Sequence, residues 1–212
     1  MGVRVVGGAF VGALIAFVWG LVFWTVLPFS DQAITRVADE GALAESLRAH
    51  VGPSGAYALP MPDHREGMTE AERQAALDIW KGKHEMGPIA LLFYRQEGIS
   101  PMDPIVMVRG FLIGLLSSML LAAFSAGAAQ RGVPFAKRVA LILGIALFAS
   151  LASHAIQWNW FYLPTRYTLT VAADLVIGWT LSGLAIAAIA APGKPKSPPK
   201  PVGRPKDEPT AA

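Results

Sequence analysis

Four long apolar runs, separated by polar connectors, dominate the pattern of the chain. The runs are approximately Val5–Leu27, Ile105–Ala129, Val139–Ile156 and Leu169–Ala191. Three of them are long enough to cross about 30 Å of hydrocarbon at about 1.5 Å per residue, and the third just reaches that length. The pattern predicts an all-α polytopic membrane protein, with a bundle of four transmembrane helices.

The connector between the first two runs, residues 28–104, carries a pattern of its own. It predicts a short helix capped by Ser30 or Asp31, a helix over Asp39–Val51, a strand over Ala56–Leu59, a helix from Thr69 to about Lys83, and a strand over Ile89–Tyr94. Thr69 and Glu72 have the spacing of a capping box. Because so few residues make a marginal core, we expect this mixed α/β segment to form a cap on the bundle.

Basic residues indicate which side of the membrane each connector occupies. Nine of the 18 basic side chains lie at the N-terminus, between the second and third runs, and in the tail: Arg4, Arg131, Lys137, Arg138, Lys194, Lys196, Lys200, Arg204 and Lys206. By the positive-inside rule both termini are cytoplasmic and residues 28–104 face outward. The proline-rich, basic tail, residues 192–212, is expected to be disordered.

Composition supports the membrane class and excludes several functions. The chain is 53% hydrophobic and 16% charged, whereas soluble domains have about 25% charged residues. Zero cysteines exclude disulfides and thiolate catalysis, and an exported segment without disulfides suits a bacterial inner membrane. The single histidines of residues 28–104, His50, His64 and His84, lack metal-ligand spacing. We therefore expect no metal, no cofactor, no nucleic-acid partner and no enzymatic activity.

Small residues recur every four positions in three of the apolar runs. They are Gly8, Gly12, Ala16 and Gly20 in the first, Gly110, Gly114 and Ser118 in the second, and Gly178 and Ser182 in the fourth. Such stripes allow the backbones of membrane helices to approach closely. They predict either packing within one four-helix bundle, or contact with a second copy or a membrane-protein partner through a stripe that the bundle leaves free.

Three ionisable residues lie inside or at the edge of the apolar runs. Counting from the cytoplasmic ends of their helices places Arg109, His154 and Asp174 at similar heights near the outer interface. Charges at such positions usually pair or face a water-filled cavity. The trio is either a structural clasp with an ion pair between Arg109 and Asp174, or a small-ligand or proton-responsive site in which His154 titrates near neutral pH.

The connector between the third and fourth runs is rich in aromatic residues. Trp158, Trp160, Phe161 and Tyr162 are typical of the belt that amphipathic rings form at lipid headgroups. We therefore expect this connector to lie at the outer membrane–water interface.

Short motifs in the connectors and the last run suggest a family resemblance. They are Gly55-x-Tyr57-x-x-Pro60, Gly87-Pro88, Trp158-Asn159-Trp160-Phe161, Pro164-Thr165 and Gly178-Trp179. Through them the chain, apart from its tail, resembles a set of uncharacterised four-span bacterial inner-membrane proteins. That set has no assigned activity, so the resemblance implies only the four-span layout.

Three functional hypotheses remain open from the sequence. The leading one is a non-enzymatic structural or accessory subunit that packs against other membrane helices. The second is a small-ligand or proton-coupled transport component that uses Arg109, His154 and Asp174. The third is a membrane enzyme acting on a lipid-borne substrate, for which the sequence offers no nucleophile or metal site.

Overall fold

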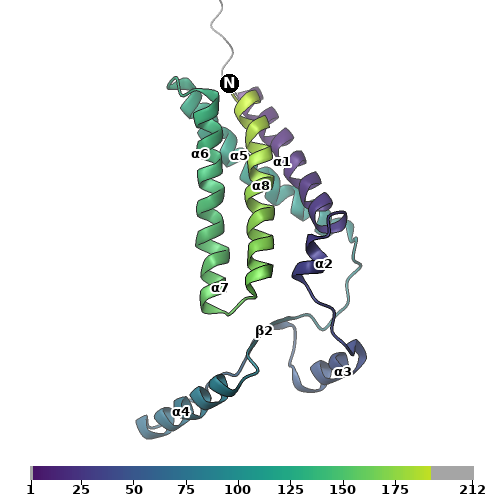
Figure 1. Ribbon diagram of the computed structural model, residues 1–212, viewed down its shortest axis with the longest axis vertical. Helices are drawn as coiled ribbons and strands as arrows, with labels where there is room; N and C mark the ends of the chain where they lie inside the picture. Colours follow the sequence, from purple (N-terminus) through teal and green to yellow (C-terminus); the bar gives the residue numbers. More distant parts are fainter. Residues whose placement is uncertain (1, 192–212) are drawn as a thin grey trace, which may run out of the picture.

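The structure, a computed structural model, describes residues 2–191 and is mostly helical (Figure 1). Four long helical stretches form a bundle: α1 (Gly2–Thr25), α5 (Pro104–Gln130), a third stretch from Phe135 to Trp160, and α8 (Thr165–Ile189). The third stretch consists of α6 (Phe135–Ser150), the π-helical turn η1 (Leu151–Ala155) and α7 (Ile156–Trp160). The segment between α1 and α5 carries α2 (Phe29–Ala33), α3 (Glu40–His50), β1 (Gly55–Leu59), α4 (Glu70–Met86) and β2 (Ala90–Tyr94).

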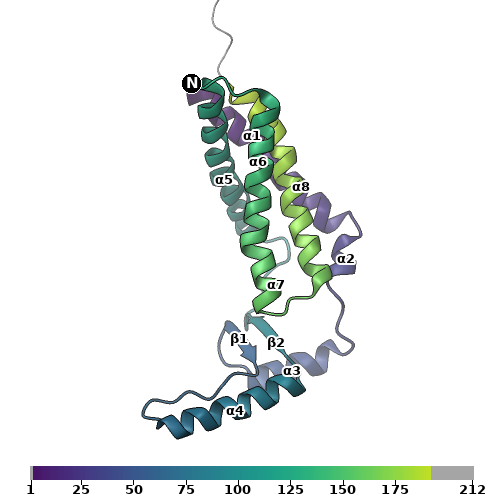
Figure 2. The ribbon, with the colours of Figure 1, turned by 60° about the vertical axis from the view of Figure 1, so that its left-hand side comes forward.

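Within the bundle, α1 packs mainly against α5 and α8, and α6 packs mainly against α8 (Figures 1 and 2). The start of α1 and the end of α8 meet, because Nη1 of Arg4 donates a hydrogen bond of 3.1 Å to the carbonyl oxygen of Ala191. We call this the termini end of the bundle, and we call the opposite end, where residues 26–103 are attached, the loop end. The predicted tail, residues 192–212, lies outside the described residues.

All four long stretches are apolar and long enough to cross a membrane, as the sequence predicted. In each stretch, only 17% to 28% of the 18 most apolar consecutive residues is buried inside the protein. The remaining apolar surface requires a hydrocarbon environment, which indicates a multi-pass membrane protein. The interior is built from small and branched side chains, including Ala9, Ala122, Ile142 and Ile186.

The third stretch begins earlier than the sequence predicted. The expected run started at Val139, after the charged pair Lys137 and Arg138, but the helix begins at Phe135 and continues to Trp160. Arg138 is inside the helix and only 5% exposed. The boundary was wrong because this charge is accommodated within the bundle and does not end the helix.

The elements of the segment between α1 and α5 largely match the prediction. Asp39 caps α3 by accepting a hydrogen bond of 2.9 Å from the Ala42 amide. Thr69 and Glu72 form the predicted capping box at the start of α4. The two strands pair antiparallel, with Gly55 opposite Tyr94. The first short helix differs, because α2 follows Pro28 without a side-chain cap and contains Ser30 and Asp31.

We call residues 26–103 the connecting segment, and the elements of this segment form no common core. No residue from position 24 to position 117 is buried. Figure 1 shows α3 and α4 extending to opposite sides of the hairpin, away from the bundle. One described contact links α4 to the turn that follows the third stretch, where the ring centroids of His84 and Tyr162 are 5.4 Å apart. The predicted elements are therefore present without a buried core of their own, and their role as a cap on the bundle stays a prediction.

Candidate functional site

The carboxylate of Asp174 lies on α8, nine residues after the helix begins at Thr165. At about 1.5 Å per residue, this places it about 13 Å along the helix from the loop end. Oδ2 of Asp174 accepts a hydrogen bond of 2.7 Å from Nε1 of Trp24, and its backbone carbonyl accepts one of 3.2 Å from Nε1 of Trp19. Two indole groups of α1 therefore hold α1 against the middle of α8.

Beside this contact lies an open cleft of about 300 Å³, which we call the Asp174 cleft. Its lining includes the carboxylate of Asp174, the imidazole of His154 and the indole groups of Trp19, Trp24 and Trp179. Most of the other lining residues are small or aliphatic. The cleft therefore combines one acid, one base and three aromatic rings in otherwise apolar surroundings, an arrangement suited to binding a small polar group.

His154 reaches the cleft from the π-helical turn η1. A π-helical turn widens the helix by one residue, and such turns occur frequently at functional sites. The hydroxyl of Ser153 donates a hydrogen bond of 2.6 Å to the carbonyl oxygen of Ala149 within the same region. The sequence pattern did not reveal this turn, because its residues, LASHA, continue an ordinary apolar helix.

Arg109 is separated from the other two members of the predicted trio. Its side chain is exposed on α5, and it forms no ion pair or hydrogen bond with any residue from 2 to 191. The predicted ion pair between Arg109 and Asp174 is therefore not formed. The reason is the order of the helices, because α5 packs mainly against α1 and much less against α8.

The small residues of the predicted stripes fall into two groups. In the first group, close contact with another helix requires the absence of a larger side chain. A Cβ atom on Gly12 would lie 2.7 Å from the side chain of Ile186, and one on Gly178 would lie 2.6 Å from Cδ1 of Trp19. Gly8 likewise packs against Ala190, and Ser118 and Ser182 are fully buried. This group packs the bundle itself.

The second group is not used for packing within the chain. A Cβ atom on Gly20, Gly110 or Gly114 would meet no other atom within 4 Å. These three glycines, together with Ala16, line an apolar groove of about 280 Å³ between α1 and α5. The bundle therefore leaves one part of the small-residue stripes free on its outer surface.

A buried arginine near the termini end was missed as a site by the sequence analysis. Nη1 of Arg138 donates hydrogen bonds of 2.7 Å to the carbonyl oxygen of Ala187 and 3.2 Å to the hydroxyl of Ser125, whereas its Nε has no partner. Within residues 2–191 its guanidinium forms no ion pair with a carboxylate. The sequence had assigned Arg138 only to the charge bias that sets topology.

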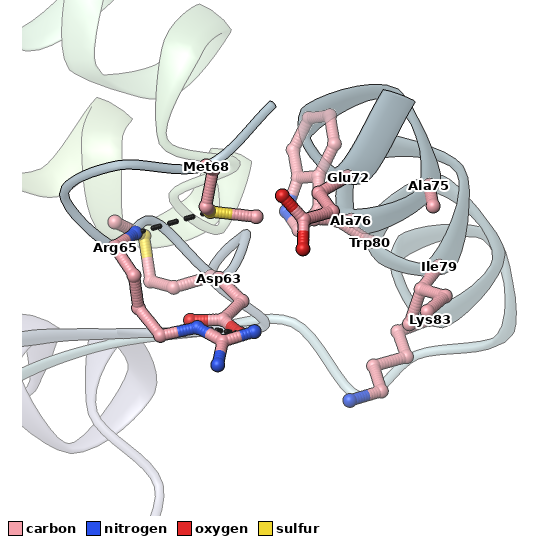
Figure 3. Close-up of a pocket in the computed structure, with 10 residues that line it drawn as sticks. Asp63, Arg65, Met68, Glu72, Ala75, Ala76, Ile79, Trp80 and Lys83 are labelled. Atoms are coloured by element: carbon pink, nitrogen blue, oxygen red, sulfur yellow. Dashed lines mark hydrogen bonds and ion pairs between the residues drawn. The ribbon is translucent and has the colours of Figure 1, made fainter. Parts of the chain in front are cut away.

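An open groove of about 290 Å³ lies on the connecting segment, beside α4, and we call it the α4 groove. Figure 3 shows the loop that carries Asp63, Arg65 and Met68 facing Trp80 and Ile79 of the helix. Nε of Arg65 lies 3.1 Å from Oδ2 of Asp63, so these two lining residues of the groove form an ion pair. Apolar side chains form much of the remaining lining, and the groove can accept an apolar side chain flanked by charges.

The four residues of the predicted aromatic belt are exposed at the loop end. Trp158, Trp160, Phe161 and Tyr162 are between 45% and 72% exposed. Nε1 of Trp158 donates a hydrogen bond of 3.0 Å to the hydroxyl of Thr165, which fixes the turn before α8. Their placement is compatible with an interfacial belt, which remains a prediction.

Comparison with known proteins gives no relative. No family model matches the chain, and neither the curated proteins nor the solved structures contain a match. Within the described part of the chain, no group of three or more His, Cys, Asp or Glu side chains could hold a metal ion. The argument about function therefore rests on the geometry of the Asp174 cleft, the α4 groove and the free glycine groove.

Proposed function

We propose that this protein is a non-enzymatic accessory subunit of a bacterial inner membrane, which binds a partner protein through its connecting segment. One observation carries the proposal: no residue between positions 24 and 117 is buried, although the segment forms capped helices and a hairpin. Elements without a common core require a binding surface supplied by another molecule.

The physical argument concerns the stability of the isolated elements. Helices shorter than about 12–15 residues are marginal alone in water, which applies to α2 with 5 residues and α3 with 11, and an isolated two-stranded hairpin is marginal at best. The segment also exposes large apolar side chains over each of its main elements, namely Leu43, Leu59, Met61, Leu77, Ile79, Met86 and Phe93. Burying this surface against a partner would stabilise both the elements and the complex.

The α4 groove has the composition of a protein-binding surface. Trp80 and two methionines provide aromatic and adaptable apolar contacts, and residues of these types are enriched at protein interfaces. The lining also includes three charged residues, Asp63, Arg65 and Lys83. Charges on an interface favour the orientation of the partner that places opposite charges beside them. The groove therefore fits a partner segment with an apolar anchor and polar flanks.

The proposed orientation follows from the charge bias and the aromatic belt. With both termini in the cytoplasm, the connecting segment and its groove lie on the outer side of the membrane. The free glycines Gly20, Gly110 and Gly114 lie on the bundle surface near the same end. A transmembrane helix of the same partner can pack there, because small residues permit close helix contact.

The test is native mass spectrometry of the full chain, extracted from the source membrane in a lipid-preserving polymer. The expected result is a stoichiometric second polypeptide, which is lost in Ile79→Asp and kept in Ala71→Asp. Both variants add one negative charge to α4, but Ile79 lines the α4 groove and Ala71 is exposed outside it. A chain that is extracted alone, or a partner that survives Ile79→Asp, contradicts the proposal.

A further inference from the structure

We propose that the Asp174 cleft is a binding site for a primary ammonium group carried by an apolar or lipid molecule. The site is independent of the α4 groove and lies within the bundle. It uses the carboxylate of Asp174 as the charged partner, His154 as a hydrogen-bond acceptor and the three indole groups as aromatic walls.

The first argument is the charge of Asp174. It is the only acidic residue of the four long helices, and within residues 2–191 no lysine, arginine or histidine forms an ion pair with it. Trp24 satisfies Oδ2 with a neutral N–H donor, and His154 is the basic side chain that lines the same cleft without forming an ion pair with Asp174. A carboxylate at membrane depth requires a counter-charge or a proton, and a bound ammonium supplies the counter-charge.

The second argument is the chemistry of the other lining residues. Indole rings attract cations through the negative face of the ring, and the lining of the cleft includes three of them: Trp19, Trp24 and Trp179. A neutral imidazole offers one nitrogen as an acceptor, and the side chain of His154 makes no hydrogen bond to another described residue that would occupy it. A primary ammonium has three N–H donors and can bond the carboxylate and the imidazole together.

The third argument is the shape of the cleft. Its volume of about 300 Å³ lies at the low end of small-molecule pockets, and it is open on one side of the bundle. Val171 and Leu175 extend its lining with apolar surface on α8. An amine attached to a hydrocarbon chain therefore fits both parts of the site, whereas an anion would meet the charge of Asp174.

The same chemistry has two sources, the ethanolamine headgroup of a phospholipid and a soluble alkylamine. The probe is n-octylammonium, compared with n-octanol, which has the same hydrocarbon chain without the charge. The full chain in phosphatidylglycerol nanodiscs is titrated with each compound, and binding is followed by tryptophan fluorescence. We expect saturable binding of n-octylammonium and no saturable binding of n-octanol.

Two variants assign the binding to the cleft. Asp174→Asn keeps an oxygen acceptor for Trp24 and removes the charge, so n-octylammonium should bind about tenfold or more weakly. Glu85→Gln removes an exposed carboxylate on α4 and should leave the affinity unchanged. If Asp174→Asn does not fold, Val171→Phe provides the same test, because it enlarges a side chain that lines the cleft without removing a hydrogen bond.

The results of these titrations distinguish a lipid headgroup from a soluble amine, and they also show whether the proposed ammonium site exists. Weaker n-octylammonium binding in nanodiscs that also contain phosphatidylethanolamine assigns the site to the lipid headgroup, and equal binding assigns it to a soluble amine. Equal saturable binding of n-octanol and n-octylammonium overturns the proposal. Unchanged affinity in folded Asp174→Asn, or in Val171→Phe, also overturns it.

Discussion

Nε1 of Trp24, at the end of α1, donates a hydrogen bond of 2.7 Å to Oδ2 of Asp174, in the middle of α8. The two residues are 150 positions apart in the chain, and Trp19, also on α1, bonds to the same residue of α8. The bond therefore fixes the relative position of two helices at the level of the Asp174 cleft.

Replacing the indole of Trp24 should destabilise the bundle. Trp24→Phe keeps an aromatic ring but removes the donor, and the loss of a hydrogen bond to a charged group typically costs about 1.5–3 kcal/mol. Trp160→Phe is the matched control, because Trp160 is 72% exposed and has no described hydrogen-bond partner for its indole. The free energy of unfolding, measured by titration with a denaturing detergent in mixed micelles, should fall only in Trp24→Phe; equal losses would contradict this role.

The contact between Gly178 and Trp19 gives a second prediction. A Cβ atom at position 178 would lie 2.6 Å from Cδ1 of Trp19, so the ring must move in Gly178→Ala. Overpacking of this kind typically costs about 1–3 kcal/mol. Gly144 is a mid-helix glycine with no atom within 4 Å of an added Cβ, so Gly144→Ala should be neutral or stabilising by up to about 1 kcal/mol. Equal thermal stability of the two variants would show that Trp19 adjusts without cost.

The long helices could be predicted from the sequence because hydropathy and length determine a membrane span almost alone. His154 and Asp174 line the same cleft, which agrees with their predicted similar height, since the helical rise per residue is constant. Their depth relative to the outer interface stays a prediction. The sequence could not place Arg109, because height along a helix does not specify which neighbouring helix a residue faces. That depends on helix order, and in this bundle α5 packs mainly against α1.

Other features of the sites depend on partners distant in sequence. Nothing near Trp19 and Trp24 in the chain indicates that both bond to Asp174. The sequence correctly predicted the helix α4 and its capping box. It could not predict that the chain itself would leave Ile79 exposed, since a periodic pattern does not identify the surface that covers it.

The capping box of α4 should respond to pH. The backbone amide of Thr69, followed by its hydroxyl, lowers the pKa of Glu72 below its ordinary value of 4.5. The ionised carboxylate therefore supports the helix start at all pH values above about 4.5, and this support is lost as pH falls through the lowered pKa. A carbon NMR titration of Glu72 should show a higher pKa in Thr69→Ala than in the wild type.

Thr69→Ala should also act locally. Loss of an N-cap side chain costs about 1 kcal/mol of helix stability. Because α4 does not pack against the long helices of the bundle, amide exchange should increase in α4 and remain unchanged in α1 and α8. Faster exchange across the bundle would contradict the separation of the connecting segment from the bundle.

Arg138 offers a test of what a buried charge contributes near the termini end. Its guanidinium is hydrogen-bonded to Ser125 and Ala187 but has no carboxylate partner among residues 2–191. Replacing a buried charge by an apolar group of similar volume is often neutral or stabilising, whereas truncation leaves a cavity.

We therefore expect Arg138→Met to keep the free energy of unfolding within about 1 kcal/mol of the wild type. Arg138→Ala should lower it by about 2–4 kcal/mol, because the volume vacated beside Ser125 and Ala187 remains unfilled. Detergent-titration unfolding of both variants in the same micelles provides the comparison. An equal loss in both variants would mean that the charge itself stabilises the fold. Its counter-charge would then come from a molecule outside residues 2–191, such as an anionic lipid at the termini end.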